Sequence, residues 1–119
     1  MVKSNNLIQE KSFNFALSII DLYKKLTEEK EYILSKQLLR SGTSIGANVK
    51  EAIAGQTKRD FIAKMSIASK ESRETGYWLR LLQASNLVNL SYEKYLSEIN
   101  DIINILTAIV KTSQSNVSS

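Results

Sequence analysis

QLLRSGTSIGANVKEAIA, residues Gln37 to Ala54, is the most informative stretch of the chain because it combines two helical faces of different character. Apolar and small residues recur every three or four positions, the spacing of a face that a packed helix buries. A row of mostly short polar groups runs beside them at the same spacing; it consists of Gln37, Ser41, Ser44, Asn48 and Glu51. Solvated faces are normally built from Lys and Glu, so this row favours internal hydrogen bonding to a neighbouring helix or subunit. A surface helix with polar filler is the alternative.

Gly42 and Gly46 lie one turn apart inside this stretch. Each destabilises a helix interior by roughly 1 kcal/mol relative to Ala. Two such positions favour a compensating close approach of another backbone. A helix break near Ser41 to Ser44 is the competing interpretation. The chain has no proline to enforce a break, and the apolar spacing continues through Val49, so we expect one continuous helix.

The composition of the 119 residues bounds the fold and the chemistry. The length corresponds to one domain that can bury a core. Histidine and cysteine are both absent, which excludes disulfides, thiol chemistry, serine–histidine catalysis, the usual zinc sites and ferritin-like di-metal sites. No apolar run approaches the roughly 20 residues of a membrane helix, and the N-terminus lacks the apolar core of a signal peptide. We expect a cytoplasmic protein without a cofactor.

Periodicity and capping signals predict helices at about residues 5–26, 28–54, 58–85 and 91–111. Thr27 is the expected cap of the second helix, and Thr57 with Asp60 resembles a capping box for the third. The first helix carries two apolar stripes and should be buried over a wide face. Short connections make neighbours antiparallel, so the prediction is an all-α, up-down-up-down four-helix bundle over residues 1–111. Residues 112–119, TSQSNVSS, should form a flexible tail.

Glu71 and Glu74 interrupt an apolar stripe that also contains Trp78. Paired carboxylates can serve as a general acid and base or bind a hard cation. More often they pair with a basic residue or accept hydrogen bonds from another helix. The candidate partners are Arg40, Asn48 and Arg73. We therefore assign Arg40, Glu71, Glu74 and Trp78, with the polar row, to a buried polar cluster or an oligomer interface, and we assign no catalytic or metal site.

The basic excess is concentrated in the middle of the chain. The net charge is +4, and residues 36 to 80 hold nine basic and four acidic side chains. A helix N-terminus also favours anions, so the predicted nucleic-acid-binding residues surround the start of the third helix: Lys50, Lys58, Arg59 and Lys64. The aromatic residue among these four, Phe61, belongs to the apolar face of the third helix, so duplex or structured nucleic acid is expected over unstructured single strands. A mild charge surplus that serves only solubility is the alternative.

Three blocks of sequence carry a family resemblance: Q-L-L-R-S-G-T-S-I-G-A-N-V-K-E-A from Gln37, D-F-I-A-K-M-S-I-A from Asp60 and K-E-S-R-E-T-G-Y-W-L from Lys70. They resemble the four helix bundle protein family, also called the 23S rRNA intervening-sequence protein family. The similarity begins with E-K-S-F-N-F-A at Glu10 and covers nearly the whole chain. S-I-x-x-N-x-x-E, starting at Ser44, is its most diagnostic part.

The resemblance implies a small bacterial four-helix bundle that assembles as a ring-like homopentamer. Some members of the family are encoded inside intervening sequences of large-subunit ribosomal RNA genes. Related proteins are accessory subunits of diversity-generating retroelements, basic pentamers that bind a reverse transcriptase and nucleic acid. The family offers no catalytic motif to transfer.

Three functional hypotheses follow. The first is a non-enzymatic oligomeric bundle that binds nucleic acid, RNA or DNA, or a nucleic-acid enzyme such as a reverse transcriptase through its central basic surface. The second is a protein–protein scaffold whose charge is incidental. The third is an enzyme that uses Glu51, Glu71 and Glu74 with a hard metal. Further copies of the chain and nucleic acid are the expected partners, and neither a membrane nor a small-molecule substrate is expected.

Overall fold

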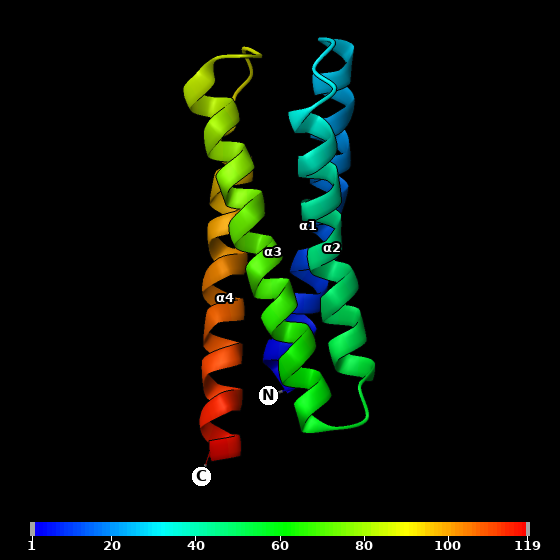
Figure 1. Ribbon diagram of the computed structural model, residues 1–119, viewed down its shortest axis with the longest axis vertical. Helices are drawn as coiled ribbons and strands as arrows, with labels where there is room; N and C mark the ends of the chain where they lie inside the picture. The colour runs from blue at the N-terminus through cyan, green and yellow to red at the C-terminus, as the bar shows by residue number, and fades with distance from the viewer. Residues whose placement is uncertain (1, 119) are drawn as a thin grey trace.

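The computed structural model describes residues 2–118, with side chains described from Asn5 to Asn116. The described residues form four helices, α1 (Val2–Glu28), α2 (Leu34–Ala54), α3 (Lys58–Ser85) and α4 (Glu93–Ser118), and contain no strand. The helices alternate in direction, each packs against its neighbour in sequence, and α4 returns to α1 to close the bundle (Figure 1). The predicted all-α, up-down-up-down bundle is confirmed.

The core follows the predicted helical spacing on α2 and α4. Ile45 and Val49 of α2 and Ile99 and Leu106 of α4 are almost completely buried. On α1 only one of the two apolar stripes is buried, and it comprises Phe15, Ile19, Leu22 and Leu26. The other, which we call the α1 outer stripe, faces solvent and consists of Phe13, Leu17 and Ile20. The expectation that α1 buries a wide face is therefore wrong within a single chain.

The two glycines of α2 lie against α1, and α2 is continuous through both. A Cβ at Gly46 would lie 3.4 Å from the backbone oxygen of Ser12, so the predicted close approach of a second backbone is confirmed there. A Cβ at Gly42 would lie 3.0 Å from both γ carbons of Ile19. The small residues of α2 thus bring the first two helices close together.

The start of α2 differs from the prediction. Thr27 does not cap α2, because its hydroxyl donates to the carbonyl of Lys24 within α1. The side chain of Glu31 takes that role. Its Oε1 accepts from the backbone N–H of Leu34 at 2.9 Å and its Oε2 from that of Ser35 at 2.7 Å. The helix therefore begins at Leu34 and not at residue 28.

The start of α3 agrees with the prediction. The hydroxyl of Thr57 accepts a hydrogen bond from the backbone N–H of Asp60 at 3.0 Å. This contact satisfies one of the free donors of the first turn. The helix spans residues 58–85, the range predicted from sequence.

The end of α4 corrects the predicted tail. The helix continues to Ser118, so the expectation of a non-helical tail is wrong for residues 112–118, while Ser119 lies outside the described residues. Ser113 is only 3% exposed. The physical reason lies in α1, which begins at Val2 rather than near residue 5. Its first turns lie beside the last turns of α4 and give them a packing partner.

Candidate functional site

A polar network joins the middle of α2 to the middle of α3. The guanidinium of Arg40 donates to Oε2 of Glu71 at 3.1 Å and also contacts Oε2 of Glu74. Each carboxylate has one further donor. The hydroxyl of Ser44 donates to Glu71 at 3.0 Å, and the indole N–H of Trp78 donates to Glu74 at 3.0 Å. Of the three candidate partners named from the sequence, the structure selects Arg40.

The electrostatics of this network favour permanent charge. The hydrogen bond from Trp78, helped by Arg40 and opposed by burial, holds the pKa of Glu74 below its usual value. The hydrogen bond that Arg40 donates to Glu74 in turn raises the pKa of Arg40. A carboxyl group that acts as a general acid at neutral pH needs a raised pKa, whereas the pKa of Glu74 is lowered. The residues with described side chains contain no group of three or more potential metal-ligating acidic side chains.

The remaining residues of the polar row lie on the flank of α2 that faces α3, but only the centre of the row is shielded. Ser41 is buried and accepts a hydrogen bond from the hydroxyl of Thr75 at 2.9 Å. Asn48 is half-buried and donates to the carbonyl of Ser44 in its own helix. Gln37 and Glu51, at the two ends of the row, are exposed. The structure therefore brings together the centre of the predicted cluster and leaves its ends at the surface.

The four predicted basic residues lie near the α2–α3 end of the bundle, on different flanks of the two helices. Lys64 is ion-paired with Glu51 at 3.2 Å, on the flank of α2 that faces α3. Lys50 lies one turn after Gly46, on the opposite flank, which faces α1. Lys58 and Arg59 are exposed at the start of α3. These four side chains surround the α2–α3 end of the bundle without converging on one point.

A basic groove lies elsewhere, between α3 and α4. Arg73, Tyr77 and Arg80 line it from α3, and the Arg73 guanidinium donates to the hydroxyl of Thr107 on α4 at 3.0 Å. The groove encloses about 370 Å³, and no acidic side chain lines it. Its remaining lining comes from Gly76, Leu96, Ile99, Asn100 and Ile103.

The spacing of arginines in the sequence contains a signal for this groove. Arg59, Arg73 and Arg80 are separated by multiples of seven residues, which places them on one flank of α3. We call these three residues the basic flank. Among the residues with described side chains, none of the three has a carboxylate within 4.0 Å.

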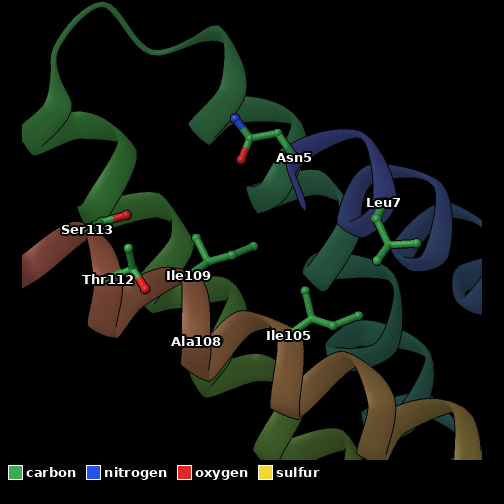
Figure 2. Close-up of a pocket in the computed structure, with 7 residues that line it drawn as sticks. All are labelled: Asn5, Leu7, Ile105, Ala108, Ile109, Thr112 and Ser113. Atoms are coloured by element: carbon green, nitrogen blue, oxygen red, sulfur yellow. The ribbon is translucent and has the colours of Figure 1, made fainter. Parts of the chain in front are cut away.

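An apolar cavity of about 280 Å³ opens between the start of α1 and the end of α4 (Figure 2). Its lining carries no charged side chain and consists of Asn5, Leu7, Ile105, Ala108, Ile109, Thr112 and Ser113. Leu7 and Ile105 lie on opposite sides of the opening, and Thr112 and Ser113 lie at one end (Figure 2). This lining suits an apolar group and offers no charged group for acid–base chemistry.

Within the described residues, none of the four helices combines the length and the apolar character that crossing a bilayer requires.

Comparison with known proteins adds two findings. The sequence profile of the 23S rRNA-intervening sequence protein family matches residues 4–108. A crystal structure of a protein of unknown function from the S23 ribosomal protein family of Bacteroides thetaiotaomicron VPI-5482 superposes with a TM-score of 0.84. The two sequences are 45% identical over 91% of this chain and 98% of that one. No curated protein matches the sequence. Because the family match spans most of the chain, this protein belongs to the 23S rRNA-intervening sequence protein family.

Proposed function

We propose that this protein is a non-enzymatic, self-associating bundle that binds nucleic acid, or an enzyme acting on nucleic acid, through the basic flank of α3. The observation that carries the proposal is the separation of charge around that helix. Its acids Glu71 and Glu74 face α2, whereas Arg73 and Arg80 face α4. These two acids and two arginines alternate along the sequence but lie on different sides of the helix.

The contacts of Arg40 make this separation electrostatically effective. Arg40 comes from α2 and pairs with both carboxylates, and neither Arg73 nor Arg80 is ion-paired with them. A guanidinium also binds phosphate through two parallel hydrogen bonds. The basic flank therefore has both the charge and the donor geometry that an anionic backbone requires.

The length of the basic flank matches an extended partner. Arg59 and Arg80 are separated by 21 positions of one helix, which corresponds to about 31 Å at about 1.5 Å per residue. That distance spans several phosphates of a nucleic-acid backbone. Binding through such contacts releases counterions, so the affinity should fall steeply as salt rises.

Self-association is supported by the α1 outer stripe. Phe13 is 65% exposed and Leu17 is 52% exposed, and they lie one turn apart on the same face of α1. Contiguous exposed apolar groups are typical of protein–protein interfaces. We propose that a second copy of the chain covers this stripe. A ring of copies would repeat the basic flank and raise the effective concentration of binding sites. The same stripe also supports the alternative function, a protein–protein scaffold with incidental charge.

The test compares two triple variants that remove the same charge from different surfaces. The first replaces Arg59, Arg73 and Arg80 by Gln. The second replaces Lys24, Lys25 and Lys36, all exposed and outside α3, by Gln. Fluorescence anisotropy would measure affinity for a duplex and a structured RNA across a salt series.

The first variant should lose affinity and lower the salt slope by about 2–3, while the second should stay near the wild type. Equal losses in the two variants would contradict the basic flank. Absence of binding by the wild type at low salt would reject nucleic acid and favour the scaffold.

A further inference from the structure

We infer that the groove between α3 and α4 holds one nucleotide of a single-stranded nucleic acid, with Tyr77 stacked on its base and Arg73 and Arg80 on the flanking phosphates. This inference rests on the proposed function and specifies its site and the form of nucleic acid. It also replaces the sequence-based expectation of duplex binding, because Tyr77 is an exposed aromatic residue beside two arginines, whereas Phe61 packs against the core.

The position of Tyr77 supports stacking. Its side chain is 56% exposed, so most of the ring is available to a ligand and does not contribute to the core. Its ring packs edge-to-face with that of Trp78, with centroids 5.3 Å apart and ring planes at 66°, which restrains its orientation. Aromatic side chains bind single strands because every unpaired base offers a face for stacking.

The two arginines stand on either side of this ring. Arg73 lies four residues before Tyr77 and Arg80 three residues after it. At the helical rise these offsets correspond to about 6 Å and about 4.5 Å along the axis. Both arginines line the same groove as the ring, one on each side of it along the helix. Alternating positive and aromatic groups along a groove are the pattern of single-strand binding surfaces.

The walls of the groove also fit a base. Its floor is apolar, formed by Leu96, Ile99 and Ile103, and suits the flat face of a heterocycle. Gly76 has no Cβ and so leaves space beside the floor. A Cβ there would lie 3.7 Å from Ile103 and 4.0 Å from Ile99. Asn100, on the α4 wall, carries both a donor and an acceptor for the edge of a base.

The groove is lined by arginines and by no acidic side chain, which favours an anionic partner. The aromatic ring of Tyr77 favours a nucleotide over an acidic peptide. An acidic peptide would satisfy the arginines but would leave Tyr77 and the apolar floor without a partner. A duplex would satisfy the arginines as well, but its bases are paired and stacked inside and cannot reach Tyr77. An unpaired nucleotide uses all of these groups.

The experiment compares an oligothymidine, a duplex of the same length and polyglutamate as ligands. The variants are Tyr77→Ala and Tyr77→Phe, with Tyr32→Ala as the matched control because Tyr32 is also exposed but lies between α1 and α2. Trp78 is the only tryptophan of the chain, so its fluorescence reports binding beside Tyr77 directly. Circular dichroism would verify that each variant is folded.

Tyr77→Ala should lower oligothymidine affinity by about 5- to 100-fold, and duplex affinity by less than about twofold. Tyr77→Phe and Tyr32→Ala should bind like the wild type, and quenching of Trp78 by oligothymidine should disappear in Tyr77→Ala. The salt slope should not change in Tyr77→Ala, because no charge is removed.

Each contrary outcome has a separate meaning. Unchanged oligothymidine affinity in Tyr77→Ala, together with a loss in an Arg73→Gln, Arg80→Gln variant, would overturn stacking and leave the proposed function intact. Competition by polyglutamate as effective as competition by oligothymidine would overturn the nucleotide site in favour of an acidic peptide. Absence of binding to both nucleic acids by the wild type would reject the proposed function itself.

Discussion

Gly42 packs directly on the buried side chain of Ile19, whereas a Cβ at Gly76 would make only ordinary van der Waals contacts with α4. Gly42→Ala should destabilise the protein by about 1–2 kcal/mol, because overpacking outweighs the roughly 1 kcal/mol gain in helix propensity. Gly76→Ala is the matched control. Its Cβ would be at 3.7 Å from Ile103, an ordinary contact, so it should gain about 0.5–1 kcal/mol.

Urea unfolding at neutral pH would measure both glycine variants against the wild type. The prediction is that the free energy of unfolding falls in Gly42→Ala and rises in Gly76→Ala. Stabilisation by Gly42→Ala would show that α1 and α2 separate easily at this point and that the close approach is not required.

Glu74 makes the stability of the protein depend on pH. Because its hydrogen bond with Trp78, helped by Arg40, lowers the pKa in the folded state, the carboxylate stabilises the fold fully above its ordinary pKa of 4.5. That stabilisation is lost as the pH falls below 4.5 and through the lower folded-state value. Glu74→Gln should therefore be less stable than the wild type at neutral pH, and the difference should shrink in acid.

Urea unfolding at neutral pH and at about pH 3 would follow this difference. Glu29→Gln is a suitable control, since Glu29 is exposed in the turn after α1. If the free energies of unfolding of Glu74→Gln and the wild type differ by the same amount at both pH values, the charge of Glu74 does not stabilise the fold.

At the scale of the element, α2 depends on the carboxylate of Glu31. This residue is only 8% exposed, and its two oxygens accept hydrogen bonds from three backbone N–H groups, those of Ile33, Leu34 and Ser35. Glu31→Ala should destabilise the protein by about 2–3 kcal/mol, because buried donors at the helix start lose a charged acceptor. Thermal or urea unfolding measures the change.

Glu29→Ala removes the same side chain two residues earlier, from an exposed position, and should change stability by less than about 0.5 kcal/mol. If the two alanine variants are equally stable, the start of α2 is held by packing and not by the carboxylate.

At the scale of the whole molecule, the bundle leaves one apolar surface on α1 without a partner in the chain. Replacing Phe13 and Leu17 by Gln should convert an assembly of several copies to a monomer and preserve the helical circular dichroism spectrum, because both side chains lie outside the core. Light scattering coupled to size-exclusion chromatography measures the mass.

Leu87→Gln is the control for this surface, since Leu87 is 58% exposed in the α3–α4 connection. It should leave the mass unchanged. A wild type that is monomeric at tens of micromolar would refute self-association, and an unchanged assembly in the Phe13 and Leu17 variant would move the interface away from α1.

The sequence alone was sufficient for the architecture, because helix spacing and capping are local. The bounds of α3, the cap at Thr57 and the buried positions of Ile99 and Leu106 all follow from residues within one or two turns. The polar character of the α2–α3 contact was also predictable, since short polar groups in a row are unusual on a solvated face. Absence of histidine and cysteine limited the chemistry without any structure.

Only the tertiary structure decided which neighbour each helical flank meets. The helical period fixes the angle between two side chains of one helix but does not say which other helix lies at that angle. For that reason the sequence did not show that Arg40 pairs with both carboxylates of α3 while Arg73 and Tyr77 face α4. It also did not show which stripe of α1 is buried, or that the last turns of α4 have a partner, because both depend on where α1 lies in the bundle.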